Sequence, residues 1–276
     1  MEPARNPLSA SRDQQEQDSH HDHGSKGRLS RMQPMYYPLF VSLEERVCLV
    51  VGGGSVGERK IKGLLRFGAT VHLVSQGRTP WVQEQCEKAH IRLLGAEYSI
   101  QALQGVDLVF AATSDRALNR RIAADARMRK IWCNMATDPD EGSCMVPSIF
   151  QQGPLTIAIG TGGLSPALAR RIREGIEAQF GREWAILLHF MGLVRKAVQA
   201  CGMDTAENQA IFQKISQLPL TVWIQNNQKE PAIRTIHPIC KSCISWEALN
   251  QFWDESWNLF SSSSLPSATA SERSDT

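Results

Sequence analysis

Long apolar runs, an excess of charge of one sign and a compact cysteine framework are all missing from this 276-residue sequence. No stretch approaches the roughly 20 apolar residues that a membrane-spanning helix needs, so we expect no membrane partner. The formal net charge of +2 provides no strong field toward nucleic acid, which we also exclude as a partner. The seven cysteines are odd in number and scattered, which favours reduced thiols over a disulfide scaffold.

The two ends of the sequence differ in texture from the part between them. Residues 1–34 contain almost no large apolar side chains, and we interpret them as a disordered tail. This segment also lacks the apolar core of a secretory signal peptide, so a cytoplasmic location is expected. Residues 261–276 are of low complexity, and we expect a second mobile tail there.

Apolar runs alternate with helical patterns over residues 35–146. The runs are short and unbroken, as in strands that are buried on both faces of a sheet. They lie at residues 47–51, 70–74, 91–94, 107–112 and 131–135, with helical patterns at 56–67, 79–89 and 117–128 between them. This alternation predicts βαβ units and hence an α/β domain with a Rossmann-like, mainly parallel sheet.

Two further regions follow this domain. Residues 147–181 contain one expected strand at 155–159 and a helix that begins after Ser165 and runs to about residue 179, which predicts a small α+β segment. Residues 182–260 predict a helical C-terminal domain. We expect breaks in it near Gly202 and across residues 218–241, where three prolines occur.

The glycine-rich stretch at residues 52–57 matches the pattern G-x-G-x-x-G, directly after a strand and at the start of a helix. Gly52 permits a tight turn, Gly54 lets the backbone approach a pyrophosphate, and Gly57 allows close packing of helix on strand. The amides at Ser55 and Val56 would then receive the phosphates. The motif alone also occurs as a structural turn, but this context favours dinucleotide binding.

The acidic residue that usually binds the ribose 2′-hydroxyl about 20 positions later is absent. The second expected strand ends in Ser75, Gln76, Gly77 and Arg78. Ser75 or Gln76 could bind the ribose, or Arg78 could pair with a 2′-phosphate. These residues alone do not decide between NAD and NADP.

Longer motifs carry a resemblance to a known family. They are VVGGGSVGERKIKGLLRFGA at 50–69, VFAATSDRALN at 109–119, CNMATDP at 133–139 and GPLTIAIGTGGLSP at 153–166. Together they resemble the precorrin-2 dehydrogenase / sirohydrochlorin ferrochelatase family, which also forms the N-terminal module of the fused sirohaem synthases. The resemblance covers roughly residues 36–180.

The resemblance implies an enzyme that oxidises the tetrapyrrole precorrin-2 to sirohydrochlorin with NAD, and that in some members also inserts ferrous iron. It further implies a homodimer, with residues 147–181 as the dimerisation segment. It places Ser55 and Val56 at the pyrophosphate, and Gln76 and Gly77 at the adenosine. Two further cofactor contacts are expected at the carboxyl ends of strands, from Thr113 and Asn134.

The expected catalytic base departs from the family pattern. The best ungapped alignment places Thr137 on the family's aspartate, with Asp138 one residue later. A threonine hydroxyl does not act as a base at neutral pH. Asp138 takes the role after a small shift of the loop, or the base is absent and Asp138 only caps the turn before Pro139. We assign the role to Asp138.

A carboxylate-rich macrocycle requires a basic site. Arg170 and Arg173 on the helix after Ser165 are candidates for binding its acetates and propionates, and the hydroxyl of Thr161 for a further substrate contact. The alternative is that these arginines cover an exposed face or pair across a dimer.

We expect no metal site of the protein's own, because Cys240 and Cys243 form a single C-x-x-C pair. Two other functions remain open. One is a non-catalytic protein that binds a dinucleotide or tetrapyrrole, since the aspartate has moved. The other is an unrelated Rossmann reductase.

Overall fold

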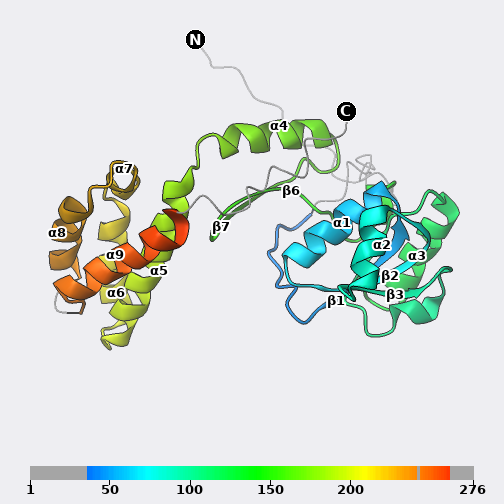
Figure 1. Cartoon of the computed structure of the whole chain (residues 1–276), viewed down its shortest axis with the longest axis horizontal. Helices are drawn as coiled ribbons and strands as arrows, with labels where there is room; N and C mark the ends of the chain where they lie inside the picture. The colour runs from blue at the N-terminus through cyan, green and yellow to red at the C-terminus, as the bar shows by residue number, and fades with distance from the viewer. Residues whose placement is uncertain (1–35, 241–242, 262–276) are drawn as a thin grey trace, which may run out of the picture. The chain divides into compact units, whose positions relative to one another are not determined.

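The computed structural model describes residues 36–240 and 243–261 of the chain. The expected tail at residues 1–34 lies outside the described residues, and so does the tail expected at 261–276 except for Ser261, which ends the last helix. Within the described part, a sheet-and-helix region is followed by a two-stranded hairpin with one helix and then by a series of helices (Figure 1).

The first region contains a five-stranded sheet, ordered β3-β2-β1-β4-β5, with every neighbouring pair parallel. Its strands are β1 (Val47–Gly53), β2 (Thr70–Arg78), β3 (Ile91–Gly95), β4 (Leu108–Ala111) and β5 (Trp132–Met135). The chain order reverses beside β1, and ligands of open parallel sheets bind at the carboxyl ends of the strands at such a point. The predicted Rossmann-like fold is confirmed.

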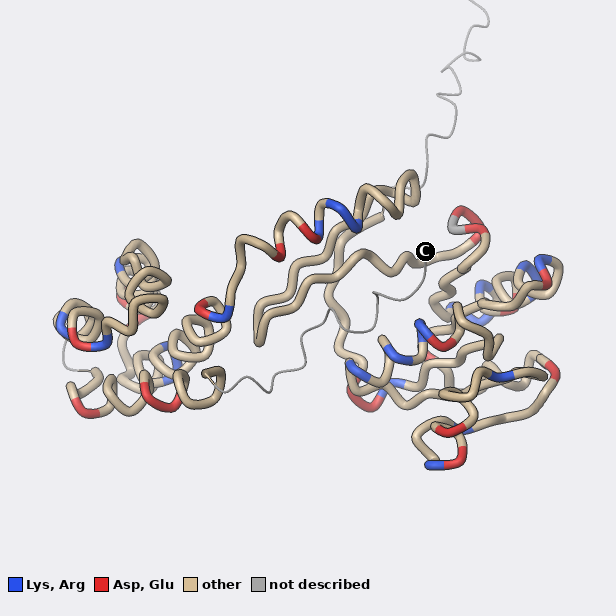
Figure 2. The backbone as a smooth tube through the Cα atoms, turned by 45° about the horizontal axis from the view of Figure 1, so that its top comes forward, with Lys and Arg blue, Asp and Glu red and all other residues tan. Residues whose placement is uncertain are grey.

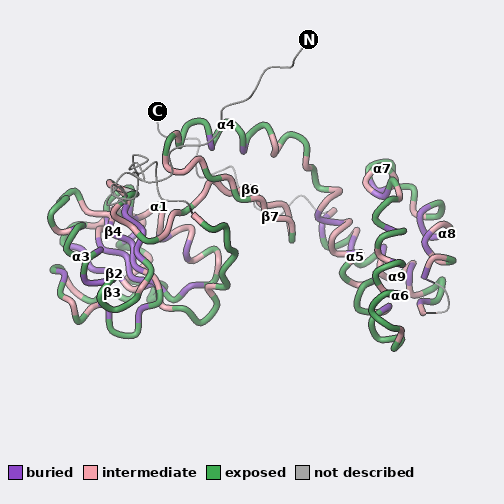
Figure 3. Tube along the Cα trace, turned by 180° about the vertical axis from the view of Figure 1, so that it is seen from behind, coloured by how far each residue is buried: buried purple, intermediate pink, exposed green. Residues whose placement is uncertain are grey.

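Three helices cover the two faces of this sheet: α1 (Ser55–Arg66), α2 (Pro80–Glu87) and α3 (Arg116–Met128). Side chains alternate between the faces along each strand. Leu49 therefore packs in the cluster that includes α3, whereas Val50 packs in the cluster that includes α1. In this region Figure 3 shows buried residues mainly along the strands. Short 3₁₀ turns occur at Ile100–Leu103 and Pro139–Glu141.

The next segment pairs β6 (Ser148–Gln152) with β7 (Leu155–Ile159) as an antiparallel hairpin, followed by α4 (Pro166–Glu177). Strand β6 was not predicted from the sequence. Of its five residues only Phe150 is buried, so the strand lacks the continuous apolar run that marks the strands of the main sheet.

The last region contains α5 (Arg182–Ala200), α6 (Thr205–Ser216), α7 (Leu220–Gln225), α8 (Lys229–Ile239) and α9 (Trp246–Ser261). The predicted break across residues 218–241 is wrong, because α7 and α8 lie there. Pro231 occupies the first turn of α8, where its missing N–H has no helical partner to lose, and Pro238 lies next to the helix end. Trp253 and Phe190 pack in the core of this region. No helix of the described part is long and apolar enough to cross a membrane.

Candidate functional site

The turn between β1 and α1 has no room for a side chain at three positions, Gly52, Gly53 and Gly57. Gly52 has φ +113°, and a Cβ there would collide with the carbonyl of Ala112. A Cβ at Gly57 would collide with the carbonyl oxygen of Gly52. The start of α1 therefore lies close against the end of β1, as the sequence motif predicts.

The N-terminus of α1 is open at this turn. Its cap residue, Gly54, has extended backbone angles, makes no side-chain cap, and leaves its Cβ position clear of any atom within 4 Å. The next helices differ, because Thr79 caps α2 and Asp115 caps α3 with side-chain oxygens. Exposed amides at Ser55 and Val56 are therefore available to an anion at a positive helix end.

The end of β2 lies next to this turn, since Gly53 pairs with Arg78. The hydroxyl of Ser75 is directed inward and donates to the carbonyl of Gly77 at 2.5 Å. Arg78 donates to Gln83 Oε1 at 2.7 Å and to the carbonyl of Ser75 at 3.3 Å. Gln76 and Gly77 are exposed. Of the two ribose candidates, Gln76 is thus the one whose side chain is available.

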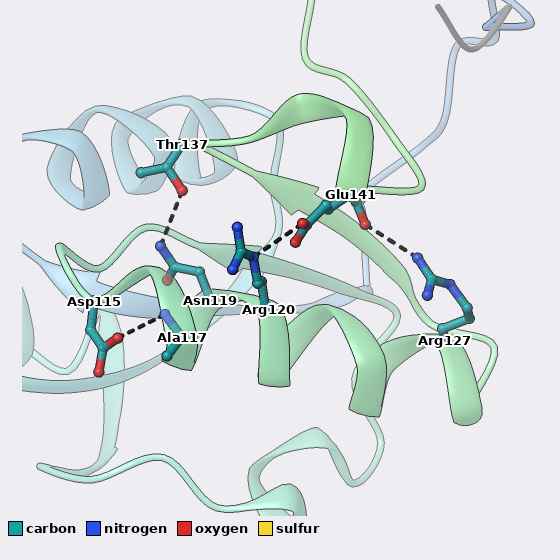
Figure 4. Close-up of polar contacts among 7 residues, drawn as sticks. All are labelled: Asp115, Ala117, Asn119, Arg120, Arg127, Thr137 and Glu141. Carbon is teal, nitrogen blue, oxygen red and sulfur yellow. Dashed lines mark hydrogen bonds and ion pairs between the residues drawn. The ribbon is translucent and has the colours of Figure 1, made fainter. Parts of the chain in front are cut away.

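The ends of β4 and β5 are joined by a fully buried asparagine on α3. Asn119 Oδ1 accepts hydrogen bonds from the Oγ1 and the backbone N–H of Thr113, at 2.7 and 3.2 Å. Its Nδ2 donates to the carbonyl of Thr113 at 2.9 Å and to Thr137 Oγ1 at 3.3 Å. Figure 4 shows the bond between Asn119 and Thr137. Thr113 and the Thr137 loop are therefore held by one side chain.

The expected base lies in the loop after β5. Asp138 is half-buried, and its carbonyl accepts from the N–H of Glu141 at 3.2 Å. Glu141 also pairs with Arg120 on α3, at 3.1 Å (Figure 4). Within the described ranges no hydrogen bond or ion pair occupies the carboxylate of Asp138.

Asn134, on β5, is buried with 6% of its surface exposed. Its Nδ2 donates to the carbonyl of Cys144 at 3.1 Å, while its Oδ1 is buried without a hydrogen-bond partner. A buried acceptor without a donor is costly, and such atoms are uncommon in native structures. The carboxyl edge of the sheet therefore has two kinds of polar group without a partner in the described residues. They are the buried Oδ1 of Asn134 and the open backbone amides that follow Gly54.

The three expected substrate contacts lie on α4 or shortly before it. In the sequence they come after the residues that form the carboxyl edge of the sheet. The hydroxyl of Thr161 donates to the carbonyl of Ser165 at 3.1 Å. Arg170 pairs with Glu174 at 2.9 Å, and Arg173, which is buried, pairs with Glu177 at 2.7 Å. Figure 2 shows both signs of charge along α4. These side chains therefore have partners on their own segment.

The thiols near the site are poor nucleophiles. All seven cysteines are free. Burial raises the pKa of Cys133 to about 11 and that of Cys144 to about 12. Both are therefore protonated at neutral pH. Over residues 36–240 and 243–261, no group of three or more His, Cys, Asp or Glu side chains could hold a metal ion.

Two residues of the site were missed by the sequence analysis. Asn119 gave no signal, because its partners lie 6 and 18 residues away along the chain. The other is Lys60, on α1. Its Nζ lies 5.8 Å from the centre of the Phe110 ring, on β4.

Comparisons with known proteins agree with this geometry. Residues 39–148 match a family model described as NAD(P)-binding, and residues 152–179 match the central segment of sirohaem biosynthesis proteins. Siroheme synthase 2 of Cronobacter sakazakii is 34% identical over 179 residues, which cover 65% of this chain and 39% of that protein. Siroheme synthase 1 of Serratia proteamaculans is 33% identical over 205 residues, 73% of this chain and 42% of that protein.

A solved structure gives a similar result. SirC, a precorrin-2 dehydrogenase, superposes with a TM-score of 0.60 at 25% identity, and the match covers 74% of this chain and all of that one. The chain spans about two fifths of the length of the siroheme synthases that it matches. Over residues 39–179 the chain thus carries an NAD(P)-binding segment and a sirohaem-biosynthesis central segment in series, and is related there to siroheme synthases and to the precorrin-2 dehydrogenase SirC.

Proposed function

We propose that this protein is an NAD-dependent dehydrogenase that oxidises precorrin-2 to sirohydrochlorin in sirohaem biosynthesis. The observation that carries the proposal is the uncapped N-terminus of α1, which opens at the switch point of a parallel sheet. The series of matched segments and the likeness to SirC support the substrate. A cytoplasmic location suits this role.

The cofactor's two ends would contact different strands. Amides at Ser55 and Val56 bind the pyrophosphate, which Gly52, Gly54 and Gly57 allow to approach. Gln76 and Gly77 lie at the adenosine. Thr113 and Asn134 lie toward the nicotinamide. When bound, NAD supplies the acceptor for the hydride that leaves the macrocycle.

Asp138 has the role of proton acceptor in this proposal. Oxidation of precorrin-2 removes a hydride and a proton from the ring system, so a base beside the nicotinamide assists the reaction. The carboxylate of Asp138 is half-buried and is not occupied by a partner in the described part. Asn119 donates a hydrogen bond to Thr137, the residue before Asp138, and thereby positions Asp138 relative to the substrate.

The substrate's acetates and propionates require cationic donors. Arg170 is the better candidate on α4, because its side chain is 53% exposed and its contact with Glu174 uses only part of its guanidinium. Arg173 is buried between Glu174 and Glu177, so it would act mainly by orienting this end of α4. Thr161 lies one turn before the helix and completes this substrate surface.

The proposed homodimer is supported by exposed apolar residues on α4 and directly before it. Leu164, Leu168 and Ile172 are spaced four residues apart, and 74%, 50% and 40% of their surfaces are exposed. Figure 3 shows most of α4 as exposed. Contiguous exposed apolar side chains indicate a protein interface, and a second copy of the chain would cover them.

The test is anaerobic incubation of the protein with precorrin-2 and NAD, with NADH followed by its absorbance and sirohydrochlorin by its spectrum. Stoichiometric formation of both products supports the proposal. Dinucleotide binding without turnover would support instead a non-catalytic binding protein, which the threonine at position 137 favours. Binding of neither NAD nor NADP would exclude both. Ferrous iron added as a second substrate then measures ferrochelatase activity.

A further inference from the structure

Asn134 Oδ1 on β5 and Lys60 Nζ on α1, two polar groups without a hydrogen-bond partner among the described residues, lie on the same face of the sheet. Phe110 and Asn134 are register partners in this parallel pair. Cys133 and Met135 pack in the core on the α3 side. Asn134, which lies between them in the strand, therefore points to the other face, where Phe110 packs against α1.

The orientation of the Asn134 amide is fixed by its neighbour. Nδ2 donates to the carbonyl of Cys144 at 3.1 Å, so Oδ1 is the free end. This oxygen is buried and accepts no hydrogen bond from the described residues. It can therefore accept a hydrogen bond from a bound molecule.

Lys60 supplies the complementary group. Its ammonium lies over the ring of Phe110, 5.8 Å from the ring centre, on the face of the sheet that Asn134 shares. Burial lowers the pKa of this amine, and the neighbouring Arg59 lowers it further. Across the described part of the chain no carboxylate forms an ion pair with it and no acceptor binds its hydrogens. The lysine thus carries donors without an acceptor.

A ligand that satisfies both groups must present an acceptor and an N–H donor side by side. We propose that Lys60 and Asn134 together bind the primary carboxamide of the nicotinamide ring. The carboxamide oxygen accepts from Lys60 Nζ, and its NH₂ group donates to Asn134 Oδ1. A carboxylate would suit Lys60 but would face the lone pairs of Oδ1, so the pair selects an amide. This inference rests on the proposed function and adds Lys60 to the site.

The position of the pair suits this role. Asn134 is the penultimate residue of β5, and Lys60 lies on the helix whose N-terminus receives the pyrophosphate. Two hydrogen bonds to one planar group fix the rotation of the ring about its glycosidic bond. The pair therefore selects which face of the nicotinamide is presented to the macrocycle.

The test measures the binding of three probes to purified full-length variants by calorimetry: NAD, ADP-ribose, which lacks the nicotinamide, and 3-acetylpyridine adenine dinucleotide, which has a methyl in place of the NH₂ group. Lys60→Met should weaken NAD binding about tenfold, the effect of one hydrogen bond to a charged donor. It should leave ADP-ribose affinity unchanged. Lys62→Met is the control on the same helix. Because Lys62 pairs with Glu58, this substitution should change the affinity for neither NAD nor ADP-ribose.

The acetyl analogue tests Asn134 separately. The unaltered chain should bind it several-fold more weakly than NAD, and Asn134→Ala should abolish this difference. Should Asn134→Ala fail to fold, two measurements still test the inference. They are the affinity of the unaltered chain for the analogue and the affinity of Lys60→Met for NAD. The inference would be overturned by an unchanged NAD affinity in Lys60→Met, or by equal affinities of the unaltered chain for NAD and the analogue. In either case, binding of ADP-ribose would leave the proposed function standing. Failure of the unaltered chain to bind ADP-ribose and NAD would overturn both.

Discussion

The amide of Asn119 donates to the hydroxyl of Thr137 at 3.3 Å, across the gap between α3 and the loop that follows β5. The same asparagine makes three further bonds to Thr113, so its side chain uses all four of its hydrogen-bonding positions. It therefore couples the two loops that flank the nicotinamide end of the proposed site.

Asn119→Ala should weaken both loops at once. Removing a buried side chain leaves its partners unpaired, at a cost of about 1–3 kcal/mol in the free energy of unfolding. We expect kcat to fall and the KM for NAD to rise several-fold. Ile122→Val is the matched control, because it removes one methyl from a fully buried site on the same helix and should lower Tm without changing KM. Thr137→Ser, which keeps the hydroxyl, should behave like the unaltered chain, whereas Thr137→Val should reproduce part of the defect.

Asp138→Ala tests the base directly. Loss of a general base typically lowers kcat by about 10²–10⁴-fold, with little effect on NAD affinity. Asp140→Ala, at an exposed position two residues later, should leave the rate unchanged. Thr137→Asp introduced into Asp138→Ala returns the carboxylate to the family's position and should recover activity. A full rate in Asp138→Ala would show that this residue only shapes the turn.

Gly54→Ala and Gly57→Ala should separate binding from folding. A methyl at position 57 meets the backbone of Gly52, and overpacking of this kind costs about 1–3 kcal/mol, so Tm should fall. A methyl at position 54 meets no atom of the protein but occupies the space expected for the pyrophosphate. Gly54→Ala should therefore keep its Tm and lose NAD affinity by more than tenfold. Unchanged affinity in Gly54→Ala would mean that the phosphates lie elsewhere.

The parallel sheet and the glycine turn were predictable because both depend on local patterns. Buried strands show as unbroken apolar runs, and a turn with φ +113° at Gly52 requires glycine in the sequence itself. The helix starts at Thr79, Asp115 and Ser165 follow from cap residues in the same way.

The remainder depends on contacts between distant residues. Strand β6 buries only Phe150 and is stabilised by its pairing with β7, so its own residues carry little signal. Helix α8 contains Pro231 and Pro238 at positions where tertiary packing of its buried face tolerates them. The role of Asn119, and the placement of Lys60 over Phe110 beside the strand of Asn134, arise only when α1 and α3 cover opposite faces of the sheet.

Leu168→Glu should disrupt the proposed homodimer. The substitution places a charge at the centre of the stripe of Leu164, Leu168 and Ile172, where a partner would have to bury it. We expect the sedimentation coefficient to shift from dimer to monomer. Ala167→Glu, an exposed position of the same helix off the stripe, should leave the mass unchanged. A monomer in the unaltered chain would contradict the dimer without affecting dinucleotide binding.

The buried thiols predict a loss of stability at alkaline pH. Burial raises the pKa of Cys48 and Cys133 to about 11 and that of Cys144 to about 12, from an ordinary value of 9.0. Because the folded-state pKa lies above the unfolded one, the contribution to stability is complete below pH 9 and is lost as the pH rises through 11–12. Each unit of difference corresponds to about 1.4 kcal/mol. Cys144→Ala should therefore flatten the decline in unfolding free energy between pH 8 and pH 11, measured by urea denaturation. The exposed Cys201→Ala should leave the slope as it is, and an equal effect of the two substitutions would show that burial of Cys144 is not the cause.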